Sequence, residues 1–294
     1  MLGEVLTAIV TPFREDGSVD LDGFRELAAF LVDSGSDGLV VTGTTGESPT
    51  LSDAEKVALW EAAVETVGDR ATVVAGAGTY DTAHSVHLTE QATELGVDGI
   101  LVVTPYYSKP PQRAIVRHFE EIAAATDRPV VVYNIPGRVV VNIESATIAR
   151  LAEIANVAAV KQAYADPAEA RFIAQETRLD LYAGDDNLIF PFLELGGVGG
   201  ICVHTHLWGP QTKELVRRYR DGDVEGARAL NEEMAPAFDL LRIQTNPIPI
   251  KAALELAGHG VARYRLPMVP PTAEELAQIR SCLERAGILA AASA

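Results

Sequence analysis

The feature that most constrains the fold of this chain is an eightfold alternation between short apolar segments and longer amphipathic ones. The apolar segments are Val/Ile/Leu runs, which are typical of parallel strands buried on both faces. We expect strands at residues 6–13, 38–42, 72–75, 99–104, 129–134, 157–161, 180–183 and 199–203. Helical stretches such as 21–34, 52–67, 81–95 and 111–126 lie between them. The pattern predicts an α/β fold, a (β/α)8 TIM barrel whose active site lies at the C-terminal ends of the strands.

The helix boundaries and glycines support the barrel over its main alternative. Ser52 and Glu55 form a capping box that opens the second helix, while Asp81 and Asp166 are candidate caps of the third and sixth. The alternative, an open doubly wound sheet, requires a reversal of strand order that the sequence does not show. The segment 76–78 (GAG) lacks the third glycine of a dinucleotide-binding loop, so we interpret it as a barrel turn.

The strand pattern stops near residue 222, and only helical stretches follow. With 294 residues, the chain suits one barrel with a small appendage. We expect a catalytic barrel at residues 1–222 and a C-terminal helical extension at 223–294 that packs on it. Its helices are expected at 224–243, 249–257 and 272–286, separated by proline-rich segments.

Charge and cysteine content restrict the partners and the compartment. The formal net charge is −17 and is spread along the chain, which disfavours nucleic acid and anionic membranes as partners. Cys202 and Cys282 are far apart and lack metal-type spacing, which favours a reducing cytoplasm. No apolar run reaches the roughly 18 residues that a membrane helix needs. We therefore expect a cytoplasmic protein that acts on small molecules.

Lys161 closes the apolar segment 157–161 and is the strongest candidate for catalysis. Lysine is strongly hydrated and is rarely placed at the mouth of a buried strand. Desolvation there lowers the pKa of an amine toward neutrality, so that it can attack a carbonyl carbon and form a Schiff base. A lysine that snorkels to the rim or pairs with an acid is the structural alternative.

Other polar groups follow the remaining strands. The segment 43–48 (GTTGES) offers backbone N–H groups and the hydroxyls of Thr44 and Thr45, a combination that can hold a carboxylate. Three tyrosines at strand ends, with Thr44, are candidates for a proton relay near Lys161; these are Tyr106, Tyr107 and Tyr133. Arg138 follows a Pro-Gly turn on the same face and could bind a carboxylate through two hydrogen bonds.

Two further pairs raise the question of a metal ion. His204 and His206 would face the same side of a strand, but no third ligand can be identified, so we do not expect a metal site. Asp185 and Asp186 end the seventh strand. We interpret one of them as the cap of a helix that begins at Asn187.

The order of these segments resembles the dihydrodipicolinate synthase / N-acetylneuraminate lyase family of pyruvate-dependent class I enzymes. The similarity runs from 8–13 (AIVTPF) to 265–267 (RLP) and includes GTTGES at 43–48. The synthase branch is the more similar one, on the segments 103–107 (VTPYY), 133–138 (YNIPGR) and 246–251 (NPIPIK). The resemblance implies the condensation of pyruvate with L-aspartate 4-semialdehyde, without a metal or organic cofactor. It also implies a homotetramer built from two tight dimers.

The resemblance assigns each candidate residue a role. Lys161 would form the Schiff base with pyruvate, which Thr45 and the backbone of Ile201 would hold. Tyr133 would transfer protons, and Thr44 would link it to Tyr107, which reaches across the dimer interface into the neighbouring site. Arg138 would orient the aldehyde substrate.

Several positions depart from the usual family residues. We expect Gln162, Val139 and His204 to lie near the aldehyde and to bear on substrate choice. The positions of the family's lysine-feedback pocket hold Pro49, Asp53, Lys56, Tyr80 and His84. Because a cation at Lys56 would repel the ammonium groups of lysine, we predict weak or absent feedback inhibition.

Three other functions stay open at this point. Another pyruvate-dependent class I aldolase could act on a sugar acid or hydroxy-acid, although such an enzyme would need hydroxyl-binding groups where Arg138 stands. A barrel that binds a metabolite without turnover would have no need for a proton relay. A metal-dependent aldolase would be sensitive to EDTA.

Overall fold

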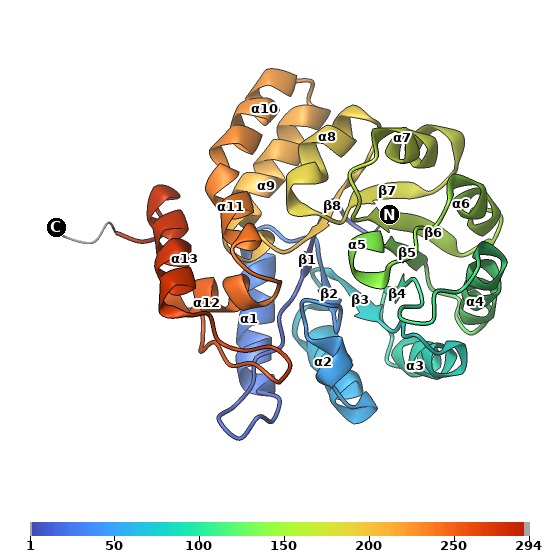
Figure 1. The fold of residues 1–294 in the computed structure, drawn as a ribbon, viewed down its shortest axis with the longest axis horizontal. Helices are drawn as coiled ribbons and strands as arrows, with labels where there is room; N and C mark the ends of the chain where they lie inside the picture. Colours follow the sequence, from blue (N-terminus) through green and yellow to red (C-terminus); the bar gives the residue numbers. More distant parts are fainter. Residues whose placement is uncertain (1, 291–294) are drawn as a thin grey trace.

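The computed structural model describes residues 2–290 and shows a closed barrel of eight parallel strands in sequence order (Figure 1). Each strand pairs with its neighbours along the chain, and β1 closes the barrel by pairing with β8. The strands are β1 (Val5–Ala8), β2 (Gly38–Val41), β3 (Thr72–Gly76), β4 (Gly99–Val103), β5 (Val130–Asn134), β6 (Val157–Gln162), β7 (Asp180–Ala183) and β8 (Gly199–Cys202). The expectation of a (β/α)8 barrel is confirmed.

The barrel core follows from the alternation of side chains along each strand. Inward-facing residues such as Leu6, Val40, Leu101 and Val131 form one buried cluster inside the barrel. The alternate residues, such as Val41 on β2, pack outward against the helices in a second and larger cluster. Both faces of the sheet are therefore apolar, which is why the strands read as continuous Val/Ile/Leu runs.

The longer helices form the outer layer of the barrel, while the short α5 (Pro136–Val139) lies at its mouth (Figure 1). They are α1 (Leu21–Asp33), α2 (Asp53–Val67), α3 (Thr82–Glu94), α4 (Gln112–Ala124), α5 (Pro136–Val139), α6 (Ser145–Leu151), α7 (Pro167–Glu176), α8 (Ile189–Glu194) and α9 (Thr205–Arg220), with short 3-10 helices η1 (Ser48–Thr50) and η2 (Asp186–Leu188). The capping box of Ser52 and Glu55 is present, and the carboxylates of Asp81 and Asp166 accept hydrogen bonds at the starts of α3 and α7. These three predicted helix starts are confirmed.

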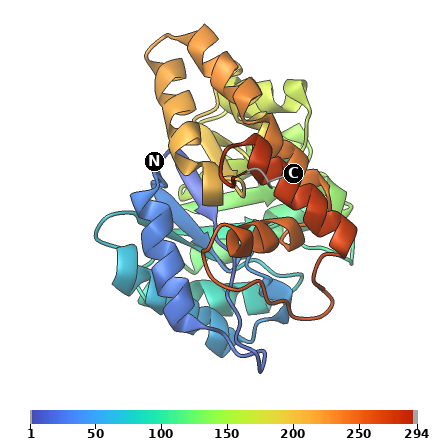
Figure 2. The same ribbon diagram turned by 90° about the vertical axis from the view of Figure 1, so that its left-hand side faces the viewer.

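Four helices follow the barrel: α10 (Val224–Glu233), α11 (Ala235–Arg242), α12 (Ile248–Leu256) and α13 (Ala273–Arg285). The single helix predicted at 224–243 is wrong, because it is interrupted at Met234. Pro236 has no N–H to continue the helical hydrogen-bond ladder, so it begins a new helix instead. Figure 2 shows these helices lying across one side of the barrel, with α12 beside α1. Residues 291–294 of the predicted extension lie outside the described residues.

Four predicted strands end too late, the first by five residues and the second, fourth and eighth by one each. β1 ends at Ala8, and Phe13 forms only an isolated bridge with Val19. β8 ends at Cys202, so His204 and His206 do not stand on a strand but at the start of α9. Among residues 2–290, no helix is long and apolar enough to cross a membrane.

Candidate active site

A cavity of about 330 Å³ opens at the C-terminal ends of the strands, where loops and the C-terminal helices meet. The polar residues that line it come from six parts of the chain. They include Thr44 and Thr45 after β2, Tyr133 on β5, Arg138 on α5, Lys161 on β6, Asp185 and Asp186 after β7, and Asn246 before α12. The sequence-predicted residues Lys161, Tyr133, Thr44, Thr45 and Arg138 are therefore brought together.

Lys161 is the penultimate residue of β6, and its side chain points into the barrel mouth with 5% of its surface exposed. Its direct partners in the sheet are Tyr133 on β5 and Tyr182 on β7. Burial lowers the pKa of the ammonium group to about 8, even though the carboxylates of Asp185 and Asp186 act in the opposite direction. At pH 7 about a tenth of Lys161 is thus neutral and nucleophilic, far more than of an ordinary lysine.

Tyr133 lies next to this amine. The Nζ atom of Lys161 is 4.3 Å from the centroid of the Tyr133 ring. Burial raises the pKa of the phenol, although the cation of Arg138 and a hydrogen bond with Thr44 oppose the shift. Tyr133 is therefore a protonated hydroxyl that can donate to a reacting oxygen and be linked to Thr44.

The loop after β2 is fastened from the C-terminal helices. The Nδ2 atom of Asn246 donates to the Oγ1 atom of Thr45 over 2.8 Å. Glu47, in the left-handed region with φ 55°, forms an ion pair with Lys251 of α12, with 2.6 Å between Oε1 and Nζ. Both partners of the pair are almost fully buried. The tail thus fixes the loop that presents Thr44 and Thr45.

Arg138 lies on the short helix α5, where its exposed guanidinium borders the cavity. An Nη2 atom is 3.5 Å from the backbone carbonyl of Asn246. Most of its hydrogen-bonding capacity is unused within the described residues. It can therefore receive a carboxylate through two donors.

The expected cluster of three tyrosines around Lys161 is wrong for a single chain. Tyr107 is 93% exposed, with φ 71°, and does not border the cavity. Tyr106 is half-buried in a neighbouring hollow, where its ring packs edge-on against Tyr80 at 5.4 Å. Because β4 ends at Val103, Tyr106 and Tyr107 lie in the loop beyond the strand, where consecutive side chains point in different directions. Of the three tyrosines, only Tyr133 reaches the amine. Ile201 sits on β8 with its side chain in the barrel interior, which leaves only its backbone for a ligand.

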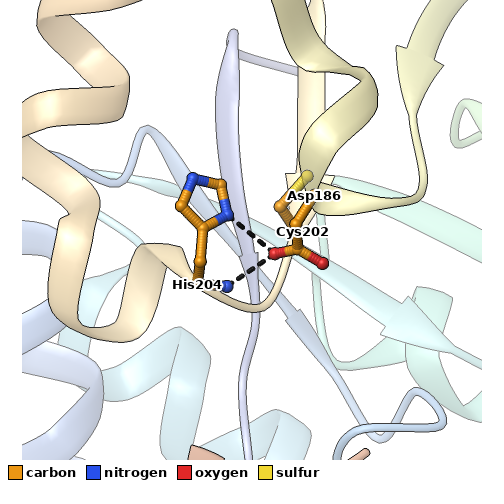
Figure 3. A group of neighbouring side chains, drawn as sticks. All are labelled: Asp186, Cys202 and His204. Atoms are coloured by element: carbon orange, nitrogen blue, oxygen red, sulfur yellow. Dashed lines mark hydrogen bonds and ion pairs between the residues drawn. The ribbon is translucent and has the colours of Figure 1, made fainter. Parts of the chain in front are cut away.

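Asp186 has a different role from the predicted helix cap. Its Oδ1 atom accepts hydrogen bonds from the backbone N–H and the Nδ1 atom of His204 (Figure 3). It also accepts one from the backbone N–H of Val203. Asp185 stands at the N-cap position of η2, but its side chain makes no cap hydrogen bond. The prediction that one of the two aspartates caps this helix is therefore wrong.

The two histidines do not form a ligand pair. Because β8 stops at Cys202, strand alternation does not align them. The Nδ1 atom of His206 donates to the carbonyl of Val203, and its Nε2 atom accepts the N–H of Val10. Both ring nitrogens of His206 are thus occupied by backbone groups.

Comparison with known proteins shows the family to which this chain belongs. The sequence profile of the Dihydrodipicolinate synthetase family matches residues 1–286. This chain belongs to that family. The 4-hydroxy-tetrahydrodipicolinate synthase of Moorella thermoacetica is 49% identical over 289 residues, 98% of this chain and 99% of the relative.

Solved structures from the family have nearly the same backbone. The synthase of Cyanidioschyzon merolae with lysine bound superposes with a TM-score of 0.96 at 40% identity, over 98% of this chain and 99% of that one. The chloride-inhibited synthase of Acinetobacter baumannii, complexed with pyruvate, gives a TM-score of 0.95 at 33% identity, over 98% and 100%. The likeness to dihydrodipicolinate synthases thus covers the barrel and the C-terminal helices alike.

None of the three departures from the usual family residues lines the cavity, and two of them are bonded elsewhere. Gln162 faces outward from β6, where it accepts from Asn134 and donates to the buried carboxylate of Glu169. His204 is buried beneath α9 and bonds to Asp186 and Thr212. Only Val139 borders a hollow shared with Tyr133. The expectation that all three lie beside the aldehyde is therefore wrong, because side chains alternate along β6 and because β8 ends early.

Sequence reasoning assigned no site role to Asn246, Glu47 or Lys251. Asn246 and Lys251 belong to the proline-rich segment 246–251 that carries part of the family resemblance. Their polar character in an apolar stretch was a signal, but their partners are some 200 residues away in the sequence. No local pattern identifies such a contact.

Proposed function

We propose that this chain condenses pyruvate with L-aspartate 4-semialdehyde to give 4-hydroxy-tetrahydrodipicolinate, a step of lysine and diaminopimelate biosynthesis. The observation that carries the proposal is a buried amine, Lys161, with its pKa lowered to about 8 by burial, beside the phenol of Tyr133. The relative from Moorella thermoacetica bears the name of this activity. These relatives do not favour the sugar-acid alternative.

The first half of the reaction builds a nucleophile from pyruvate. The neutral amine of Lys161 attacks the ketone carbon of pyruvate, and loss of water gives the Schiff base. Tyr133 transfers the protons that carbinolamine formation and dehydration require. A proton then leaves the methyl carbon, and the resulting enamine carries the electron pair for carbon–carbon bond formation.

The second half joins the two substrates and releases the enzyme. The enamine carbon attacks the aldehyde carbon, whose oxygen takes up a proton to become the 4-hydroxyl group. The amino group of the semialdehyde then attacks the imine carbon and displaces the amine of Lys161. The ring closes in this step, and one water is lost over the whole reaction.

Pyruvate binding would use the loop after β2 and the backbone of Ile201. The oxygen of Thr45 already accepts a hydrogen bond from Asn246, so its own hydroxyl proton is available for the pyruvate carboxylate. Because the formal charge of the chain is −17, such local donors are needed to attract an anion. Arg138 would bind the carboxylate of the aldehyde substrate at the rim of the same cavity.

We infer that the site is completed by a second copy of the chain. Tyr107 is almost fully exposed, which leaves its hydroxyl free to enter a neighbouring site and reach Tyr133 through Thr44. We propose a homotetramer of two tight dimers in the cytoplasm. Within each chain, residues 1–222 would form the catalytic barrel and residues 223–294 the extension that fastens its pyruvate loop.

Reductive trapping tests the proposal directly. The wild-type chain and Lys161→Ala are incubated with pyruvate and borohydride, and the intact masses are compared. We expect a pyruvyl adduct on the wild type alone. A second incubation with pyruvate and L-aspartate 4-semialdehyde, without reductant, should yield the cyclic product. An adduct without product would reject the aldehyde, and a wild type that forms no adduct would reject Schiff-base chemistry.

A further inference from the structure

His204 is a buried titratable group that the mechanism above does not use. Its side chain is fully buried between Asp186 and α9 (Figure 3). Its Nδ1 atom lies 2.7 Å from Oδ1 of Asp186, and its Nε2 atom lies 2.8 Å from Oγ1 of Thr212. The ring is therefore held from both sides, in contact with a carboxylate that borders the active-site cavity.

The carboxylate of Asp186 is fixed by three N–H donors that converge on one oxygen. Besides the imidazole, the backbone N–H groups of Val203 and His204 lie 2.7 and 2.6 Å from Oδ1. Burial raises the pKa of this carboxyl, but the hydrogen bonds from His204 and Val203 outweigh burial and hold the pKa below its ordinary value. Asp186, whose side chain is 13% exposed, is thus a stable anion in the same cavity as Lys161.

A metal site is the competing explanation for this cluster. One ligand atom each from Asp186, Cys202 and His204 lie within 4.8 Å of one another. However, Oδ1 of Asp186 already accepts three hydrogen bonds, and the Sγ atom of Cys202 lies 3.6 Å from the carbonyl of Ala183. Burial also raises the pKa of the thiol well above its ordinary value, which disfavours the thiolate that metals bind. The cluster is arranged as a hydrogen-bonded network.

We propose that His204 is a positioning residue that holds Asp186 as a fixed anion facing Lys161, where the carboxylate stabilises the positive charge of the protonated Schiff base. The proposal rests on the proposed function, since it assumes that Lys161 forms an imine. A fixed negative charge in a low-dielectric site favours an iminium over neutral states without any reorganisation. His204 would act only through Asp186.

Other ionisable groups also face Lys161 and Asp186. They are Tyr133 on β5, Arg138 on α5, Asp185 before η2, Cys202 on β8 and His206 on α9. Each of them stays in place in the test variants. A change in the titration of Lys161 that follows the substitution of His204 can therefore be assigned to the His204–Asp186 contact.

The test is the pH profile of Schiff-base formation, measured with pyruvate and cyanoborohydride in the full chain. The variants are Asp186→Asn, His204→Leu, and His204→Asn, whose amide can still donate to Asp186. Loss of the anion should lower the pKa of Lys161, so the acid limb of the profile should move to lower pH, on the order of one unit for Asp186→Asn. His204→Leu should move it in the same direction, while His204→Asn should retain the wild-type limb.

The possible outcomes separate three ideas. If His204 has a purely structural role, its substitution lowers the extent of Schiff-base formation at every pH and leaves the acid limb of the profile in place. That result would overturn the proposal. If His204→Leu does not fold, Thr212→Val replaces it, since this variant removes the partner of Nε2. Its acid limb must then move to lower pH by less than that of Asp186→Asn. An acid limb that does not move in Thr212→Val also overturns the proposal. A wild type that forms no adduct would reject the proposed function itself.

Discussion

At the scale of single residues, the proposed nucleophile and the phenol beside it are held by backbone pairing. Lys161 and Tyr133 are register partners on β6 and β5. Their separation is thus set by the spacing of the strands in a sheet, which is the most rigid part of the barrel. A side-chain constellation on strands is better suited to imine chemistry than one on loops.

Tyr133→Phe tests the proton-transfer role. Removal of the hydroxyl should lower kcat by about 10²- to 10⁴-fold, the usual contribution of general acid–base catalysis. The variant should stay folded, because the apolar ring remains in the core. Steady-state rates and thermal unfolding measure the two effects.

Tyr182→Phe is the matched control. Tyr182 pairs with Lys161 on the other side, but its hydroxyl donates to the backbone carbonyl of Gly3, away from the cavity. This variant should lose about 1 kcal/mol of stability and keep its rate. Equal losses of kcat in both variants would contradict a specific role for Tyr133.

His206 makes the stability of the fold sensitive to acid. Burial lowers its pKa to about 4, and its neutral ring bridges the carbonyl of Val203 and the N–H of Val10. The unfolded chain binds a proton near pH 6.5, whereas the folded chain binds it only near pH 4. The free energy of unfolding should therefore be fully retained above pH 6.5 and fall between pH 6.5 and 4, by about 3 kcal/mol from this residue.

His206→Asn should have a shallower decline over this range. The variant loses hydrogen bonds at every pH, so its free energy of unfolding is lower than that of the wild type above pH 6.5. That free energy then decreases less as the pH falls to 4. Urea unfolding at several pH values measures both curves. His118, whose pKa burial also lowers to about 4, remains in both proteins and accounts for part of the residual decline. Parallel curves would contradict the assignment.

At the scale of elements, α12 and the loop after β2 are joined by a buried ion pair. The Nζ atom of Lys251 also stacks over the ring of Phe13 at 4.4 Å, and the second oxygen of Glu47 accepts the N–H of Arg265. The loop that presents Thr44 and Thr45 thus depends on charge neutralisation from the tail. Removal of one partner would leave a buried charge unpaired.

Lys251→Met should destabilise the protein by about 3–5 kcal/mol. It should also raise the KM for pyruvate, because Thr45 lies in this loop and is displaced when the loop loses its ion pair. The double variant Glu47→Gln/Lys251→Met removes both charges and should recover much of the lost stability. Denaturant unfolding and pyruvate titrations measure these effects, and a stable single variant with unchanged KM would contradict the role of the ion pair.

The sequence predicted the strands and the position of the site, but not its connections. Continuous apolar runs identified all eight strands, and the polar residues after them identified Lys161, Tyr133 and Thr44. Strand alternation by itself places Gln162 outward, one residue from an inward Lys161, so the orientation of Gln162 is predictable from the sequence. The contact between Asn246 and Thr45 could not be predicted, because it depends on how the extension folds back onto the barrel.

At the scale of the whole molecule, the exposed position of Tyr107 predicts dependence on assembly. If Tyr107 completes the site of a second copy, specific activity should fall on dilution below the dissociation constant of the dimer. Tyr107→Phe should lower kcat and leave sedimentation unchanged. Analytical ultracentrifugation combined with assays over the same concentrations tests this, and full activity in a monomer would contradict it.

Lysine should inhibit this protein weakly or not at all. In the region that corresponds to the family's feedback pocket, the carboxylate of Asp53 already pairs with His84, at 3.0 Å, and lies near the buried Lys56. Asp53 is the only carboxylate at the five described positions of that region, so none of them offers a free one to the ammonium groups of a ligand. A titration with millimolar lysine should leave the rate unchanged, and a halved rate would contradict the prediction.

The hydrogen bond from Asn246 to Thr45 spans 201 positions of the chain. A ribosome finishes all eight strands before it adds the residue that fastens the loop after β2. A product that stops after residue 222 would keep Lys161 and Tyr133 and would lack both Asn246 and Lys251. Under the proposed function, turnover should therefore report on complete synthesis, since an interrupted translation product lacks the side chains that fasten the loop presenting Thr45.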